Sequence, residues 1–408
     1  MYKFYSYSRI ALISLIVIIT IIATVYCYQI ESTANEEPVT EQIEVTEVEE
    51  PTEAEETTEP EDVVVDTRSE YERLTDELNK ALETKDFDYE VNTLFKDTFE
   101  RVYDNFESWE KGYRDFPTRE EFIMNCIINP IYIIEEVEFY EAGSEEAERL
   151  LDDGMPLGWT WPGENPTIGI IAEKADTEEW STRENDIERF LHELTHCKDG
   201  ALIDDFNSEY DDLYSSFSEG MATFTQKFMY GAEEEHGGSW GIADSEEEYN
   251  IEYSKYNCIG YLINLNFCEK LVYLAGYKNV EKVEFGEIHF ADLVDIIANR
   301  YGREETDKFF DTVTKMYVSY EKSWRSDEVF NLAVEAEMMF LDFMKQDIER
   351  LNNAQAAKAY KPIYDFYINK NLPVVEYRNS YANINREFFE IEALDELLNE
   401  KLAMNSPN

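Results

Sequence analysis

The feature that most constrains this chain is an uncharged, largely apolar run from Ile10 to Tyr28. At about 1.5 Å per residue, a helix of this length nearly crosses the hydrocarbon core of a bilayer, which is roughly 30 Å thick. Lys3 and Arg9 precede the run, and the next charged residues after it are acidic. The positive-inside rule therefore predicts a cytoplasmic segment at 1–9, a transmembrane signal anchor at 10–28, and a single-pass cell-membrane protein whose remaining residues are extracellular.

Two other fates of this segment are distinguishable by sequence. Ser32-Thr33-Ala34 offers a small-x-small cleavage site, although it lies well beyond the apolar run, and cleavage there would give a secreted protein. Lipid modification of Cys27 is disfavoured, because Tyr26 stands where a small residue is expected.

Residues 29–66 are predicted to form an acidic, disordered stalk. From Glu31 to Asp66 the chain consists largely of Glu, Thr, Val and Pro and contains no Lys or Arg. Such a composition cannot bury enough apolar surface to offset the entropy lost on ordering. Like charges extend a linker of this kind, so the folded region at 67–408 should stand away from the membrane.

The charge of the chain excludes one class of partner. The sequence has 90 acidic and 35 basic residues, for a formal net charge of −55, and this field repels nucleic acid. A hydrophobic content of 43% is sufficient for a sizeable core. The five cysteines include no Cys-x-x-Cys pair, so we expect neither a cysteine zinc site nor a disulfide framework.

The patterning of residues 67–408 predicts an α+β fold that is predominantly helical, with a small mixed sheet. Thr118 and Glu121 form a capping-box signature in the helical front part. The best strand candidates are Ile131–Tyr140 and Ile168–Ala172. Further helices are expected at Thr182–Asp199, at Glu219–Tyr230 with Gly231 as its stop, and at Tyr253–Ala275, within a helical carboxy-terminal part at 245–408.

The predicted helix Thr182–Asp199 carries a metal-binding pattern, His192-Glu193-Leu194-Thr195-His196. Residues four apart on a helix share a face, so His192 and His196 can reach one ion. Zinc is bound by neutral imidazole nitrogens and, in catalytic sites, keeps one position for water. A carboxylate beside that water, here Glu193, can take its proton. Chance is a weak explanation, because the chain has only 4 histidines and this motif uses two.

A zinc site needs a third protein ligand, and Phe217-Ser218-Glu219-Gly220-Met221-Ala222 supplies a carboxylate after the gap at 197–218. The helical motif followed by a Glu-Gly-x-Ala segment resembles the gluzincins, a group of zinc peptidases. The resemblance implies a Zn2+ ion held by His192, His196 and Glu219, with Glu193 as general base. It also implies a zincin-like peptidase domain with a catalytic core at about 130–231, and a peptide or protein as substrate.

The sequence departs from this group in one position and leaves others open. Thr223 stands where many gluzincins have an acidic residue that orients a zinc-binding imidazole. Ile168–Glu173 resembles the edge strand that aligns substrate in that group. The metzincin alternative is excluded, because Asp199 and Leu202 replace its Gly and His. Several other carboxylates remain alternatives to Glu219 as third ligand: Asp204, Asp205, Glu209, Asp211 and Asp212.

The sequence does not identify the residue that would stabilise the oxyanion formed when water attacks the peptide carbonyl. Gluzincins commonly use a downstream Tyr or His, and the candidates are Tyr261, Tyr256 and Tyr253, with His236 behind them. The resemblance does not separate an endopeptidase from an aminopeptidase, and the role of residues 352–408 and the oligomeric state stay open. The rival reading of the whole chain is a non-catalytic cell-surface binding protein with a structural or vestigial zinc site.

Overall fold

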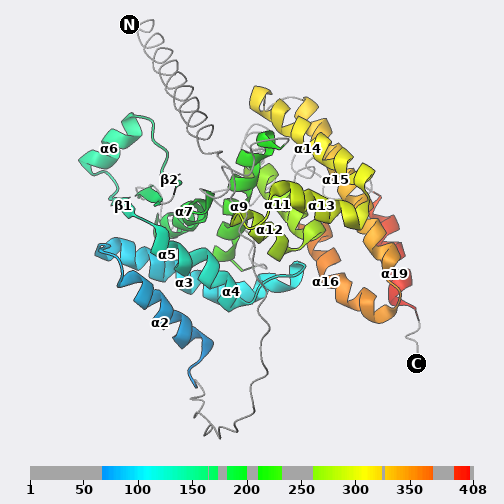
Figure 1. The fold of residues 1–408 in the computed structure, drawn as a ribbon, viewed down its shortest axis with the longest axis horizontal. Helices are drawn as coiled ribbons and strands as arrows, with labels where there is room; N and C mark the ends of the chain where they lie inside the picture. The colour runs from blue at the N-terminus through cyan, green and yellow to red at the C-terminus, as the bar shows by residue number, and fades with distance from the viewer. Residues whose placement is uncertain are drawn as a thin grey trace, which may run out of the picture. The chain divides into compact units, whose positions relative to one another are not determined.

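The fold is predominantly helical, with one small sheet of three strands (Figure 1). The structure is a computed structural model, and it describes residues 67–163, 165–172, 182–199, 210–231, 261–323, 327–370 and 390–404. All of these belong to the unit that begins at Thr67. The expected anchor and stalk lie outside the described residues. No helix within the described ranges is long and apolar enough to span a membrane.

The amino-terminal helices start at side-chain caps that the sequence encodes. Ser69 forms a capping box with Glu72, and Thr118 forms one with Glu121. Asp88 caps the helix that starts at Tyr89 through its carboxylate. The predicted capping box at Thr118 is therefore confirmed. The elements of this part are α2 (Glu70–Leu82), α3 (Tyr89–Trp109), η1 (Glu110–Gly112), α4 (Arg119–Ile123), the π-helical η2 (Met124–Ile128) and α5 (Asn129–Ile133).

The sheet contains β1 (Glu136–Tyr140), β2 (Gly158–Trp161) and β3 (Thr167–Ile171), in the order β1-β3-β2. β1 runs parallel to β3, and β2 runs antiparallel to it. The helix α6 (Glu145–Asp152) lies between β1 and β2 in sequence. Two expectations were wrong in detail. The first strand begins at Glu136, because residues 129–133 form α5, and β3 is the central strand rather than an edge strand.

Three helices form the middle of the described unit: α7 (Thr182–His196), α9 (Tyr214–Gln226) and α11 (Tyr261–Ala275) (Figure 1). The 3-10 turns η3 (Asp211–Leu213) and η4 (Lys227–Met229) flank α9. The prediction for α7 is confirmed, except that the helix ends at His196. The prediction that a helix begins at Glu219 was wrong, because α9 already starts at Tyr214 and places Glu219 in its second turn.

In the residues that the structure describes, the carboxy-terminal part consists of helices joined by short connections, as expected. Its elements are α12 (Tyr277–Glu284), α13 (Phe290–Tyr301), α14 (Arg303–Ser323), α15 (Asp327–Arg350), α16 (Ala354–Lys370) and α19 (Ile391–Leu402). Tyr364, Tyr367 and Leu398 of the last two helices are buried in the main hydrophobic core. The described residues after 352 thus help to complete the helical unit.

Two features hold α9 against its neighbours. A Cβ atom at Gly220 would lie 2.5 Å from the backbone oxygen of Asn264 and 2.5 Å from the sulfur of Cys268, so only glycine permits this approach of α9 to α11. At the other end of α9, the ammonium group of Lys227 forms a buried ion pair with Glu269 of α11. The rings of Trp109 and Tyr113 surround the same ammonium group, with centroids 4.6 and 4.7 Å away.

We predict that Gly220→Ala destabilises the fold and displaces Glu219. The added methyl group meets backbone and cannot be accommodated by a side-chain rotation, so a cost of about 1–3 kcal/mol is expected. Chemical denaturation monitored by circular dichroism measures this loss. Ser215→Ala, on the exposed face of the same helix, is the matched control and should change stability by less than about 0.5 kcal/mol. Equal stability of Gly220→Ala and wild type would contradict the close packing of α9 and α11.

Candidate metal centre

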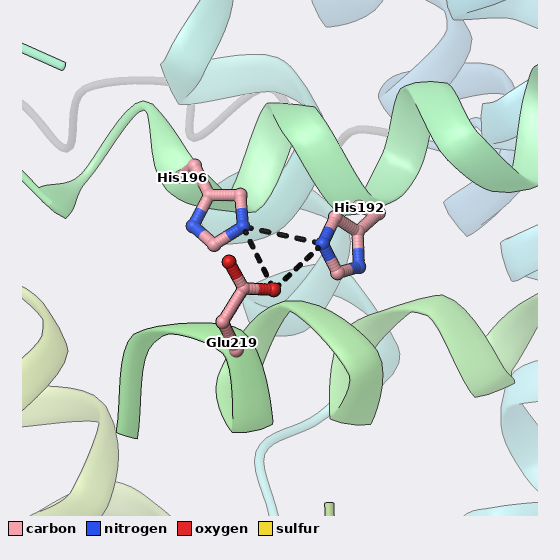
Figure 2. A group of neighbouring side chains, drawn as sticks. All are labelled: His192, His196 and Glu219. Atoms are coloured by element: carbon pink, nitrogen blue, oxygen red, sulfur yellow. Dashed lines mark hydrogen bonds and ion pairs between the residues drawn. The ribbon is translucent and has the colours of Figure 1, made fainter. Parts of the chain in front are cut away.

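His192 and His196 project from one face of α7 towards α9, and Glu219 projects from α9 towards them (Figure 2). The Nε2 atoms of the two histidines are 3.2 Å apart. The Oε2 atom of Glu219 lies 3.4 Å from the Nε2 atom of His192 and 3.8 Å from that of His196. The three side chains therefore form a group that could hold a metal ion.

The spacing of these three atoms fits a zinc ion. Bonds of about 2.0–2.1 Å at tetrahedral angles put neighbouring ligand atoms roughly 3.3 Å apart. The separations of 3.2 and 3.4 Å match this value, and that of 3.8 Å requires only a small movement of the Glu219 side chain. Two imidazoles and one carboxylate suit zinc and other transition metals, and they disfavour calcium and magnesium, which prefer oxygen ligands.

Hydrogen bonds at the other ring nitrogens orient both imidazoles. The Nδ1 atom of His196 lies 2.8 Å from Oδ2 of Asp199, and the Nδ1 atom of His192 lies 3.1 Å from Oε1 of Gln226. Both partners are acceptors, so each Nδ1 carries a proton and donates it. In the neutral rings, both Nε2 atoms then present lone pairs towards Glu219. This is the tautomer that a metal-ligating histidine needs.

Asp199 is itself held by a second hydrogen bond. The hydroxyl of Ser218, the residue before Glu219, donates to Oδ2 of Asp199 over 2.6 Å and lies 3.1 Å from Nδ1 of His196. Residues of α9 thus contribute both the carboxylate of the candidate metal group and a support for the carboxylate that orients His196.

The electrostatics of this group call for a cation. The Oε2 atom of Glu219 is buried and receives no hydrogen bond from the described residues. Burial by itself lowers the pKa of His196, but the hydrogen bond to Asp199 and the surrounding carboxylate charges raise it to about 9. Burial raises the pKa of Glu219, but the two imidazoles lower it overall. Near neutral pH a proton on His196 therefore offsets part of the negative charge around the metal-free group, and a metal ion would replace that proton.

Glu193, the expected base, is buried and follows His192 directly in the sequence. Its side chain contacts the sheet. The hydroxyl of Thr160 in β2 lies 2.9 Å from Oε2 of Glu193 and 2.8 Å from its main-chain oxygen. The charge of Glu193 has the smallest effect of the carboxylate charges that raise the pKa of His196, three residues later in the chain.

The structure brings together the three predicted ligands and tests only part of the alternatives. Asp212 is exposed and outside the group, whereas Asp204, Asp205 and Glu209 lie outside the described residues, as does the side chain of Asp211. Of the oxyanion candidates, Tyr253, Tyr256 and His236 also lie outside them, and Tyr261 begins α11 without a described side chain. Thr223 does not orient an imidazole, because its hydroxyl donates to the main-chain oxygen of Glu219 over 2.7 Å.

Sequence reasoning missed four residues that support this group: Asp199, Ser218, Gln226 and Thr160. Helical spacing could have found two of them. Asp199 follows His196 by three residues, and Gln226 follows Glu219 by seven, which is about two turns. Thr160 carries no local signal, because β2 was not predicted and its contact with Glu193 spans 33 positions.

Comparisons with protein-family models, with curated proteins and with solved structures found no match to this chain. The candidate metal centre therefore rests on the residues and their geometry alone.

We predict that Asp199→Asn weakens metal binding about 10- to 100-fold, because loss of the carboxylate charge removes the group that orients and polarises His196. Isothermal titration calorimetry with zinc at pH 7 measures the change. Asp212→Asn removes an exposed carboxylate in η3, just before α9, and is the control, with an expected affinity equal to wild type. An unchanged affinity in Asp199→Asn would show that His196 does not depend on Asp199.

Proposed function

We propose that this protein is a zinc-dependent peptidase that hydrolyses peptide bonds with water. The observation that carries the proposal is the juxtaposition of a His-His-Glu group with a buried carboxylate, Glu193, on the same helix as the two histidines. A purely structural metal site has no use for a base beside it. Within the described residues the group supplies three ligands, which leaves one position of a tetrahedral zinc ion for water.

His192, His196 and Glu219 would hold the zinc ion, which when bound lowers the pKa of water and polarises the carbonyl of the substrate. Glu193 takes a proton from the attacking water and passes it to the nitrogen of the leaving amine. Asp199 and Gln226 keep the two imidazoles in the tautomer that presents Nε2 inwards. The side chain of Glu219 is 35% exposed, so the group is not sealed from solvent on that side.

We further propose that this peptidase acts outside the cell while its amino-terminal segment anchors it in the membrane. The apolar run at 10–28 would anchor the chain in the cell membrane, and the acidic residues at 29–66 would form the stalk. The substrate is a peptide or a protein, and the net charge of −55 argues against nucleic acid as a partner.

The test separates metal binding from catalysis in the full-length chain. We predict that Glu193→Gln keeps one zinc ion per chain but lowers the cleavage rate of a fluorogenic peptide library at least about 10²-fold, because the base is lost. Glu219→Ala should lose both the zinc ion and the activity, because it removes a ligand. Glu184→Gln changes a carboxylate at the start of the same helix and should match wild type in both respects.

Two outcomes would contradict the proposal. Full activity in Glu193→Gln would exclude Glu193 as the base. A wild-type chain that binds zinc but cleaves no peptide would favour a non-catalytic cell-surface binding protein with a structural zinc site.

A further inference from the structure

The contact between β2 and α7 involves both carboxylate oxygens of Glu193. Thr160 approaches Oε2 from one position of β2. Gly158, two residues earlier, shares the same face of the strand. A Cβ atom at Gly158 would lie 2.9 Å from Oε1 of Glu193, and 2.7 Å from the Cγ and Cδ atoms of Arg189, one turn earlier on α7. A larger residue at this position would therefore displace the side chains of Glu193 and Arg189 from where they lie against the strand.

The hydroxyl of Thr160 joins the side chain of Glu193 to its own backbone. A threonine hydroxyl has one proton, and the two acceptors within its reach, at 2.8 and 2.9 Å, are the main-chain oxygen and Oε2 of the same residue. Glu193 lies in the last turn of α7, where main-chain oxygens lose their intrahelical partners. The hydroxyl therefore shares its one proton between the main-chain oxygen at the end of the helix and the carboxylate.

A general base works only within hydrogen-bonding reach of the proton that it takes. The side chain of Glu is long and flexible, so its carboxylate needs partners that hold it in one place. In the described structure these partners come from β2. This strand contributes none of the three residues of the candidate metal group, His192, His196 and Glu219. Its contact with Glu193 is therefore separable from metal binding.

We propose that Gly158 and Thr160 form a seat that positions the carboxylate of Glu193 as the base of the reaction. This inference rests on the proposed function. Thr160 is a positioning residue, because it acts through Glu193 and not on the substrate. The seat sets the rate of the chemical step, whereas the metal ligands set metal affinity.

A purely structural role of Thr160 predicts a different set of changes. If the hydroxyl serves only to cap the end of α7, its loss lowers thermal stability, and activity falls only as far as folded, metal-loaded protein is lost. If it positions Glu193, its loss lowers kcat by more than any loss of folded, metal-loaded protein explains, while KM and the zinc content of the folded chain stay close to wild type.

The experiment compares Thr160→Val, which removes the hydroxyl at nearly constant shape, with Thr160→Ser, which keeps it, in the full-length chain. We expect kcat of Thr160→Val to fall about 10- to 100-fold, as for a misplaced catalytic group, and Thr160→Ser to stay within about threefold of wild type. Gly158→Ala should also lower kcat, because its methyl group displaces Oε1. Thr167→Val, on the neighbouring strand β3, is the matched control and should keep wild-type kcat.

A wild-type kcat in Thr160→Val would overturn the seat, as would a loss of activity that merely follows a loss of zinc or of folded protein. Failure of the proposed function is recognised separately, by a wild-type chain without peptidase activity. In that case the crystal structure of zinc-loaded Thr160→Val tests the positioning of Glu193, because it needs no measurement of activity. A Glu193 carboxylate displaced from β2 supports the seat, and an unmoved carboxylate overturns it.

Discussion

The site depends on the packing of α7 against α9, which forces three electron-rich atoms into one buried place. The Nε2 atoms of His192 and His196 and the Oε2 atom of Glu219 face one another at 3.2 to 3.8 Å. Lone pairs at these distances repel unless a cation lies among them. The surrounding structure increases the demand for a cation, because Asp199 adds a further negative charge behind His196. The close approach at Gly220 and the buried ion pair of Lys227 hold α9 where this happens.

Much of the site could be predicted from sequence, because its central part is local. The spacing of His192, Glu193 and His196 matches the period of a single helix, so these three residues can be placed together from the sequence alone. The prediction of Glu219 as the third ligand was based on the resemblance of its segment to the gluzincins, and in the structure Glu219 lies opposite the histidines. The class of the fold, helical with a small mixed sheet, follows from residue patterning alone.

The remainder depends on contacts between distant segments, which periodicity does not report. The start of α9 was misplaced because Tyr214–Ser218 has no capping signature, and its turns are stabilised by burial against other elements. β2 is only four residues long and lies between Pro156 and Pro162, residues that mark turns and loops in a sequence. Its contact with Glu193 therefore could not be anticipated. The strand order, with β3 in the centre, is likewise set by pairing between segments.

The most direct test of the central claim is a crystal structure of the zinc-soaked protein with anomalous data collected at the zinc absorption edge. The account predicts one strong peak between α7 and α9, bonded to Nε2 of His192, Nε2 of His196 and a carboxylate oxygen of Glu219 at about 2.0–2.2 Å. A protein without a peak at this position, or with zinc bound only by other residues, would contradict it.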